Sequence, residues 1–576
     1  MDAITKSFLN EFTDSKGYDS LTQSEQFEMF TNFCIVNKEY DSVSFDEKEI
    51  STGKNTQGID GIGIIVNNKL CNSSNEIQEL IDLNRTLIVS FVLIQSKTSS
   101  KFDGKQIDNF FRWTKSFFKD SPDLFVTDEM KNFIDMKEFI YSNSKYMKER
   151  NPICNLYFCS TGKWVEDSNL LEVINGNKEE LDNLNLFEDI NFTPCDSKKL
   201  QYLYRKTKEP VEASIKFERK VTIPTISNIK VAYSGMIPFS EFRKIIIDDT
   251  GKMKSVFNDN IRDYLEQENN AVNSDIAQTL RNGDLDSFCI LNNGVTIVAD
   301  EISGAGDNIT ITNYQIVNGC QTSNVLYENR SVEGIEKMHV PIKVIVTNKN
   351  DIKSQITRAT NNQTAVDAVE LEALTEFQRN LEYYYNALPN DDFKLFYERR
   401  TNQFKNSDIP MNRIINRETQ IKVFSSMLLN KPHLVAGYYG KLIKEMGEDI
   451  FNASHDYLPY YTSAMTYFKL EQYYNQNKLD KTSRRFRYQI LMIFRFIVSP
   501  QSVPSLKDKK RIDAFCNQIL AILKNEKLAI EKFKKAINFL RSEQLDLNFN
   551  DRKTVERKNT TDIIEFGLKN EYLVNN

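Results

Sequence analysis

The sequence has little histidine. Only His339, His433 and His455 occur among 576 residues, and no two of them have the spacing of a metal-binding pair. This scarcity argues against zinc peptidases, two-histidine metal sites and nucleases that depend on histidine. The eight cysteines are scattered and form no CxxC pair, so neither a disulfide scaffold nor a cysteine zinc site is expected. Any catalysis has to rely on carboxylates, Lys, Ser, Cys or Tyr.

Long apolar runs are also missing. No stretch of about 18 apolar residues is present, and the N-terminal MDAITKSFLNEF does not have the basic and apolar regions of a secretory signal. We therefore expect a cytoplasmic protein with no membrane partner. Hydrophobic residues make up 40% of the chain and charged residues 27%, which is ordinary globular composition. The length is enough for about three domains.

The charge is unevenly distributed, although the net value is only −6. Residues 1–60 carry 12 acidic and 5 basic side chains, whereas residues 484–558 carry 18 basic and 8 acidic ones. A solvated helical surface is the simplest explanation of the basic end, and phosphate contacts are another. Within it, RRFRY (484–488) interleaves arginine with aromatic residues, as base-stacking sites do. Helical spacing predicts instead that Phe486 faces the core while the arginines stay in solvent.

The order of predicted elements indicates an α/β multidomain fold. Residues 1–215 alternate helices and strands, and the apolar run TLIVSFVLIQSK (86–97) predicts a central strand that is buried on both faces. Residues 216–400 predict a second α/β domain, in which CILNNGVTIVAD (289–300) is an expected β segment. Residues 401–576 are expected to be helical, and the polar last thirty or so to be loosely ordered.

Two short motifs carry the strongest chemical signal, GIDG at 58–61 and IQSK at 94–97. Gln95 and Lys97 are two residues apart on a strand and share one face. Asp60 can neutralise Lys97, and Glu28, on a helix predicted over 22–40, can add a second carboxylate. Carboxylates, an amide oxygen and waters suit Mg²⁺, and a neighbouring lysine can orient or deprotonate the attacking water. The alternative is a simple Asp60–Lys97 salt bridge with Gln95 as a hydrogen-bonded residue at the strand end.

The segments EQFEMF, GIDGIGIIVNNK, FVLIQSKTSSKFDG and IDNFFRW resemble the PD-(D/E)xK nuclease fold. The similarity is to the variant with Gln in the acidic position, as in Mrr-like restriction enzymes. This resemblance implies a restriction-endonuclease-like domain in which Asp60, Gln95 and Glu28 are metal ligands and Lys97 is the catalytic lysine. Glu25, one turn before Glu28, is the alternative helix acid. Because Gln95 carries no charge, the resemblance also implies a lower metal affinity.

Segments further along the chain resemble the AIPR family, named for abortive infection and phage resistance. They are NDNIRDYL (258–265), FCILNNGVTIVAD (288–300), YQIVNGCQTSNVL (314–326), ITRATNNQTAVDAVELEAL (356–374) and FYERR (396–400). Together the two resemblances imply a prokaryotic anti-phage nuclease that uses Mg²⁺ or Mn²⁺. They imply nucleic acid as the partner, with DNA favoured over RNA, and a nucleotide or a phage-derived molecule as a trigger. Homo-oligomer formation stays open.

The middle segment contains unusual densities of Asn, Gln and Gly beside apolar strands. Their order resembles the ParB/sulfiredoxin-like fold and implies a nucleotide- or phosphate-binding pocket. The candidate residues are Arg262, Asn318, Gly319, Gln321, Thr322, Asn361, Asn362 and Gln363. Turn formation explains the same Asn-rich segments, and helix capping explains Thr322 and Ser323. Glu398, Arg399 and Arg400 form another polar cluster, for which a surface ion pair is the simpler interpretation and phosphate contact the other.

These patterns together predict a cytoplasmic, Mg²⁺-dependent endonuclease of anti-phage defence that hydrolyses phosphodiester bonds. The alternative is a non-catalytic regulator that binds nucleotide or DNA and retains a degenerate nuclease fold. A further alternative is a nuclease that stays silent until a partner or a small nucleotide binds.

Overall fold

The computed structural model places most of the chain in two compact units, which are described separately. One unit contains Met1–Thr207 and Ala373–Asn576, and the other contains Lys208–Glu372. The residues that the structure describes are 1–40, 45–53, 56, 58–119, 127–147, 150–248, 251, 253–254, 256–257, 280, 285–292, 294–349, 352–353, 355–356, 359, 367–399, 403–404, 407–436, 446–549 and 552–572. The division into domains at 215 and 400 stays a prediction, whereas packing joins the two ends of the chain in one unit.

The N-terminal part of the first unit is built on a five-stranded sheet of order β2-β1-β3-β4-β5. The strands are β1 (Gly61–Val66), β2 (Lys69–Cys71), β3 (Val89–Lys97), β4 (Ile153–Ser160) and β5 (Asp189–Cys195). β1 is antiparallel to β2 and β3, while β3, β4 and β5 run parallel. The apolar run that predicts a central strand does form the middle strand, β3, so that prediction is confirmed.

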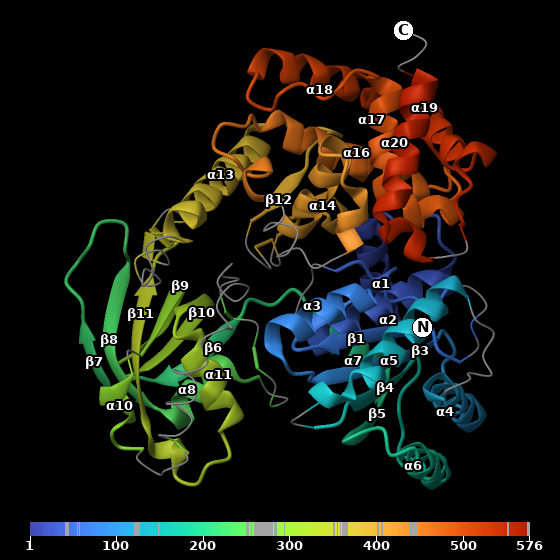
Figure 1. The fold of residues 1–576 in the computed structure, drawn as a ribbon. Coiled ribbons are helices and arrows are strands. Elements are labelled where there is room, and N and C mark those ends of the chain that lie inside the picture. The colour runs from blue at the N-terminus through green and yellow to red at the C-terminus, as the bar shows by residue number, and fades with distance from the viewer. Residues whose placement is uncertain are drawn as a thin grey trace. The chain divides into compact units, whose positions relative to one another are not determined.

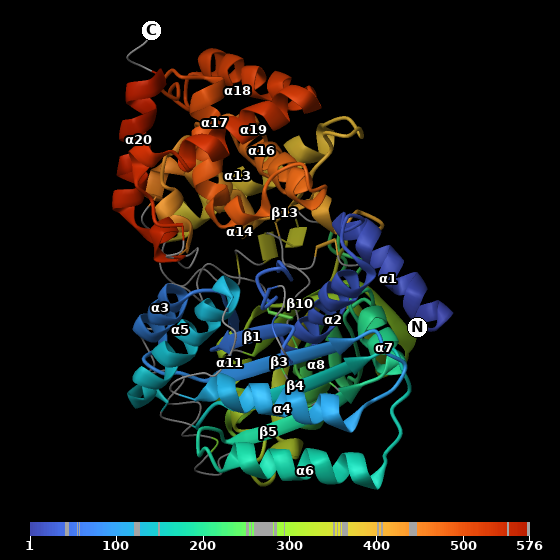
Figure 2. The ribbon, with the colours of Figure 1, turned by 90° about the vertical axis from the view of Figure 1, so that its right-hand side faces the viewer.

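Helices cover both faces of this sheet (Figure 1 and Figure 2). Alternate residues of β3 enter different cores: Phe91 and Leu93 enter one, and Val92 and Ile94 the other. The core around Val92 contains residues of α1 (Ala3–Lys16), α2 (Gln23–Tyr40) and α7 (Ser197–Lys206). The core around Phe91 contains residues of α3 (Ser74–Asn84), α4 (Gly104–Phe118), α5 (Asp128–Ser142) and α6 (Ser168–Asp182). Burial on both faces explains why β3 is apolar along almost its whole length.

The C-terminal part of the first unit, called the helical half below, packs its helices around one apolar core. Its main elements are α13 (Asp367–Ala387), which belongs to this unit from Ala373 on, β12 (Phe396–Glu398), β13 (Ile414–Asn416), α14 (Arg417–Leu428), α16 (Leu458–Asn475), the 3₁₀ helix η7 (Lys481–Phe486), α17 (Arg487–Val498), α18 (Lys509–Lys524), α19 (Glu526–Leu540) and α20 (Lys558–Tyr572). The expectation of a loosely ordered end is wrong for α20, because Ile564 and Leu568 are buried in the core.

The second unit contains a six-stranded sheet of order β6-β10-β9-β11-β8-β7. Its elements are β6 (Glu212–Lys216), β7 (Arg219–Thr222), β8 (Val231–Pro238), α8 (Phe239–Ile246), α10 (Phe288–Leu291), β9 (Val295–Ala305), β10 (Asn308–Asn318), α11 (Cys320–Glu328) and β11 (His339–Val346). The first residues of the expected β segment at 289–300 are helical instead, because a turn at Gly294, with φ of 78°, starts the strand later.

The mixture of helices and sheets confirms an α/β protein with more than one compact unit. In the described part of the chain, no helix combines the length and the apolar character that crossing a membrane requires.

Candidate metal centre at the end of strand β3

Asp60 is positioned by a tight turn immediately before β1. Gly58 has a φ of 79°, and a Cβ atom at this position would lie 2.1 Å from Cδ1 of Trp113 on α4. Only glycine combines that backbone conformation with such a close aromatic neighbour. The Asp60 N–H then donates to the carbonyl oxygen of Ile94 at 2.8 Å. The GIDG motif therefore places Asp60 against the end of β3.

The Asp60 carboxylate receives three hydrogen bonds from residues at the end of β3. Its Oδ2 accepts from the Ser96 N–H at 2.7 Å, from the Ser96 hydroxyl at 3.0 Å, and from the Gln95 side-chain amide. Burial raises the pKa of Asp60, and the attraction of Lys97 and these hydrogen bonds offset that effect only in part. Gln95 is 1% exposed, and its side-chain nitrogen donates to Asp60. Its side-chain carbonyl oxygen is the atom that could bind a metal.

Glu28 is the second carboxylate of the site. Its Oε1 accepts a hydrogen bond from the Ser51 hydroxyl at 2.8 Å. Burial, and after it the negative charge of Asp60, raise the pKa of Glu28 to about 8. The electrostatic effect of Asp60 on Glu28 means that the two acids are close enough to repel each other.

Glu25, the alternative helix acid, has a different role. Its carboxylate accepts from the backbone N–H and the hydroxyl of Thr22, both at 2.8 Å, as in a capping box at the start of α2. Glu25 therefore stabilises the helix terminus, and Glu28 is the acid that faces Asp60.

Lys97 is the last residue of β3 and is partly exposed. Its positive charge lowers the pKa of both Asp60 and Glu28 against the effect of their burial, so it lies in the field of both acids. Within the described part of the chain its ammonium group forms no ion pair or hydrogen bond. The alternative of a simple Asp60–Lys97 salt bridge is therefore not what the structure contains.

The donor set fits a hard divalent cation. Mg²⁺ binds oxygen ligands, takes one or two protein carboxylates and keeps several waters. A cation between Asp60 and Glu28 would offset the repulsion that raises the pKa of Glu28. Among the described residues, no three or more His, Cys, Asp or Glu side chains form a group that could hold a metal. The candidate centre therefore offers two carboxylates and the Gln95 amide.

A buried amide without a partner lies beside the two acids. Asn32 is one helical turn after Glu28 and is 0% exposed. Neither its Nδ2 nor its Oδ1 has a hydrogen-bond partner among the described residues. A Cβ atom at Gly61 would lie 2.3 Å from Asn32 Oδ1, so the amide packs directly against the residue that follows Asp60. Such an orphaned polar group is unusual in a protein interior, and its two polar atoms are able to bind a water or an ion.

The middle-domain candidates are only partly described. Asn318 ends β10, and Gly319, with φ of 89°, precedes α11 and packs against the Gly294 carbonyl. Arg262, Asn361, Asn362 and Gln363 lie outside the described residues, as does the side chain of Gln321. The nucleotide pocket, to which Thr322 also belongs, therefore stays a prediction.

The expected capping role of Thr322 and Ser323 is not observed. The helix starts one turn earlier, at Cys320, and the cap residue Gly319 has no side-chain hydrogen bond. The Ser323 hydroxyl donates back to the Gly319 carbonyl oxygen at 2.8 Å.

Two expectations about arginines are wrong. The side chains of Arg484, Arg485 and Arg487 are 16%, 24% and 15% exposed, and each forms an ion pair with the N-terminal part of the unit. Phe486 is buried, as expected. Arg399 is also not in a surface pair, because its Nε donates to Glu382 Oε2 at 2.9 Å where both side chains are buried. Its neighbour Glu398 is 4% exposed, and Arg400 lies outside the described residues.

Sequence reasoning missed Ser51, Ser96 and Asn32, which contact or adjoin the acids. Ser96 lies between Gln95 and Lys97 in the motif, so a position near the site could have been predicted for it. The positions of Ser51 and Asn32 could not have been predicted, because only the fold brings Ser51 to Glu28 and Asn32 to Gly61.

Comparison with known proteins gives one family match. The family model described as AIPR protein matches residues 257–550, about half of the chain. The match begins after the five-stranded sheet and does not include Asp60, Gln95 or Lys97. No curated protein and no solved structure matches the chain.

Proposed function

This chain belongs to the AIPR family, and from that premise we propose that it is a metal-dependent endonuclease that hydrolyses phosphodiester bonds, with DNA as the favoured substrate. Membership of a family named for abortive infection and phage resistance indicates a role in phage defence. The proposed nuclease centre lies outside the matched residues. Its support is therefore the geometry of the N-terminal sheet.

One observation carries the proposal. Asp60 and Glu28 are two partly exposed acids at the end of β3, where the charge of Asp60 raises the pKa of Glu28. Gln95 contacts Asp60, and the unpaired Lys97 lies in the field of both acids. A partly buried acid pair without a cation partner costs free energy, and sites of this kind are associated with function. The PD-(D/E)xK resemblance attributes metal binding and catalysis to the same four residues.

The chemistry follows from these side chains. Asp60, Glu28 and the Gln95 carbonyl oxygen would hold Mg²⁺ or Mn²⁺, which as a bound Lewis acid lowers the pKa of a water molecule and polarises the scissile phosphate. Lys97 orients the attacking water and stabilises the negative charge that develops on the phosphate. The Ser96 N–H and hydroxyl keep the Asp60 carboxylate in place. In this proposal the middle unit and the helical half recognise the trigger or the nucleic acid.

The test is a cleavage assay with supercoiled plasmid, linear DNA and RNA in Mg²⁺, Mn²⁺ or EDTA. We expect wild-type protein to cleave DNA only with metal, and Lys97→Ala to be inactive with its fold intact. Lys101→Ala is the matched control, because Lys101 is an exposed lysine shortly after β3. Cleavage that persists in Lys97→Ala, or that EDTA does not stop, would refute the proposal. Binding of DNA or nucleotide without any cleavage would favour the non-catalytic regulator.

A further inference from the structure

Residues 45–53, called the linking segment below, connect the helical half with the candidate metal centre. This segment follows α2 and precedes β1 in the chain. Its first part carries Asp46 and Glu49, which contact the helical half. Its second part carries Ser51, which contacts Glu28.

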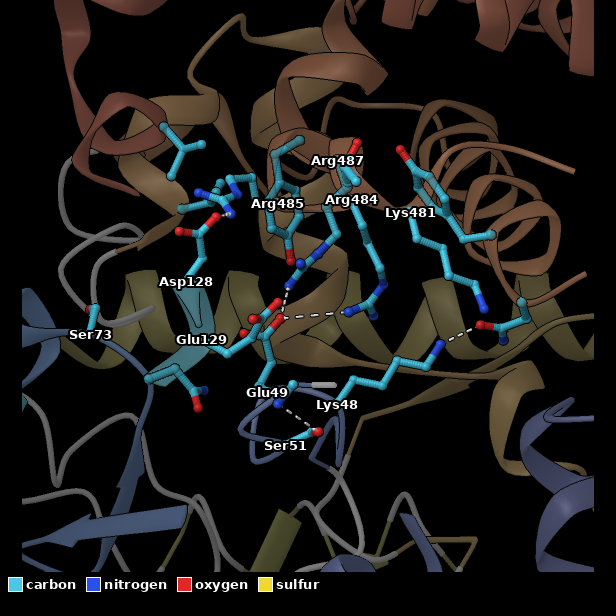
Figure 3. Close-up of a pocket in the computed structure, with 18 of the residues that line it drawn as sticks. Lys48, Glu49, Ser51, Ser73, Asp128, Glu129, Lys481, Arg484, Arg485 and Arg487 are labelled. Atoms are coloured by element: carbon cyan, nitrogen blue, oxygen red, sulfur yellow. Dashed lines mark hydrogen bonds and ion pairs between the residues drawn. The ribbon is translucent and has the colours of Figure 1, made fainter. Parts of the chain in front are cut away.

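Two arginines of the helical half hold the first part of the linking segment. Arg484 Nη2 lies 2.6 Å from Asp46 Oδ2 and 2.9 Å from Glu471 Oε2. Arg487 Nη2 lies 2.7 Å from Glu49 Oε1 (Figure 3). Burial alone would raise the pKa of Asp46, but the attraction of Arg484 and its neighbours holds that pKa well below its usual range. These contacts are strong because they are partly buried and hydrogen-bonded.

The second part of the linking segment is bonded to the start of β1. Ser51 pairs with Gly61 in an antiparallel bridge, and its hydroxyl donates to Glu28 Oε1 at 2.8 Å. The Ile62 N–H donates to the Ile50 carbonyl at 2.8 Å, and the Thr52 N–H donates to the Asp60 carbonyl at 3.2 Å. The same short stretch, residues 50–52, therefore binds the backbone next to Asp60 and supplies the hydroxyl that contacts Glu28.

The linking segment has little freedom between its two parts. Ile50 is 1% exposed in the apolar core, and Glu47 is 0% exposed and accepts from the Tyr18 hydroxyl at 2.6 Å. Only Ile50 separates Glu49 from Ser51, a distance of about 7 Å along an extended chain. Glu49 and Ser51 therefore share one short, anchored stretch of backbone, through which a displaced Glu49 would disturb Ser51.

Both sets of contacts border one cavity of about 510 Å³ in this unit. Glu28 lines it from the N-terminal part. Glu49 and Ser51 line it from the same part, and Arg484 and Arg487 line it from the helical half (Figure 3). Glu28 is the residue by which the candidate metal centre reaches this cavity, so a molecule that enters it would lie beside Glu28 and the two arginines.

We propose that Arg484 and Arg487 are positioning residues, which hold Glu28 ready for metal through the linking segment and so make metal binding depend on the helical half. This inference rests on the proposed function, because it concerns the same metal centre. Both arginines lie within the residues that the AIPR model matches. The matched part therefore controls a centre that lies outside it.

The test measures Mn²⁺ affinity by calorimetry in the full chain. Ser51→Ala removes a hydrogen bond to a metal ligand and should weaken Mn²⁺ binding about tenfold. Arg487→Ala should weaken it by a similar factor. Because both act along one path, the double variant should bind Mn²⁺ no more than about tenfold weaker than wild type. Arg487→Lys keeps a positive charge at Glu49 and should retain most of the affinity.

Arg541→Ala is the matched control. Arg541 pairs with Asp480 at 2.6 Å inside the helical half and does not contact the linking segment. This variant should lose some stability and bind Mn²⁺ as wild type does. Unchanged Mn²⁺ affinity in Arg487→Ala, or an equal loss in Arg541→Ala, would overturn the inference. A loss in the double variant that equals the product of the single losses would also overturn it.

A second measurement separates this inference from the proposed function. Hydrogen exchange of the metal-free protein reports the linking segment and residues 25–32 directly. Faster exchange in both segments of Arg487→Ala supports the linkage, even if wild-type protein binds no Mn²⁺ and cleaves nothing, a result that would refute the nuclease. Faster exchange confined to the surroundings of residue 487 would overturn the linkage, even if the wild-type protein is an active nuclease.

Discussion

Two groups of acids in the same unit differ in what neutralises them. Asp46 and Glu49 lie against Arg484 and Arg487, and the pKa of Asp46 is held below its usual range. Asp60 and Glu28 lie at the end of β3 with hydrogen bonds but no ion pair among the described residues, and their pKa values are raised. Burial acts on both groups in the same direction, so the difference comes from the cations.

This contrast separates structural acids from candidate functional ones. An acid that the chain supplies with an arginine needs nothing else and holds two parts of the unit together. An acid pair that the chain leaves without a cation lowers stability, and it persists where an external cation binds. Substitutions in and around the two groups test whether the acids behave in these different ways.

The largest effect is expected at Lys97. Lys97→Ala should reduce metal-dependent cleavage by at least about 100-fold, because the residue serves the reaction and not the fold. Circular dichroism and the thermal midpoint should stay close to wild type, since Lys97 is partly exposed and forms no ion pair among the described residues. Lys101→Ala should cleave normally. An unfolded Lys97→Ala protein would mean that the lysine is structural.

The next effect is expected at Arg484. Arg484→Ala leaves Asp46 and Glu471 without their cation and should lower the free energy of unfolding by about 2–3 kcal/mol, less than for a fully buried pair. Urea unfolding measures this change. Arg541→Ala, in a more exposed pair, should cost no more than about 1 kcal/mol. Equal losses of unfolding free energy in the two variants would show that the Asp46–Arg484 pair is no stronger than the more exposed pair.

Glu28→Gln should move stability in the opposite direction. With a folded pKa of about 8 and an unfolded value of about 4.3, wild-type protein loses stability as the pH rises between these values. In EDTA at about pH 7 the variant should be more stable by about 1–2 kcal/mol, and its stability should vary less over that range. Thermal unfolding across the pH range checks this. A less stable Glu28→Gln protein would show that the charge of Glu28 is already neutralised within the folded protein.

The smallest effect is the acid dependence of Asp46. Its folded pKa lies below the unfolded value of about 3.9, so its contribution is present above that pH and is lost as the pH falls through the folded pKa. Between about pH 5 and pH 2.5 wild-type protein should therefore lose about 1 kcal/mol more than Asp46→Asn. Urea unfolding at each pH gives the difference. If the unfolding free energies of the two proteins changed in parallel with pH, the ion pair between Asp46 and Arg484 would be contradicted.

Much of the N-terminal fold could be predicted from local pattern. The apolar run at 86–97 predicts β3, and the helical spacing of Phe27, Phe30 and Phe33 predicts α2, because periodicity reports which faces are buried. Asp60, Gln95 and Glu28 could be placed near one another from the order of these elements alone. The sequence also predicts that Lys97 shares a strand face with Gln95. It does not predict that the Lys97 ammonium group lacks an ion-pair partner among the described residues.

The long-range ion pairs could not be predicted in this way. Helical spacing places Arg484 and Arg487 outside the core of their own helices, and it carries no information about which distant segment covers them. Asp46 and Glu49 are more than 400 positions away in the chain. The same limit applies to Arg399, whose partner Glu382 lies on a helix that the local sequence does not connect with it.

The most direct test of the metal centre is Mn²⁺ binding to wild-type protein, Asp60→Asn and Glu382→Gln. Glu382 is a buried acid that already has an arginine partner, so it is the matched control. Titration calorimetry should find one site in wild-type protein and in Glu382→Gln, with equal affinity, and binding at least about tenfold weaker in Asp60→Asn. Equal Mn²⁺ affinity in Asp60→Asn and wild-type protein would contradict the account.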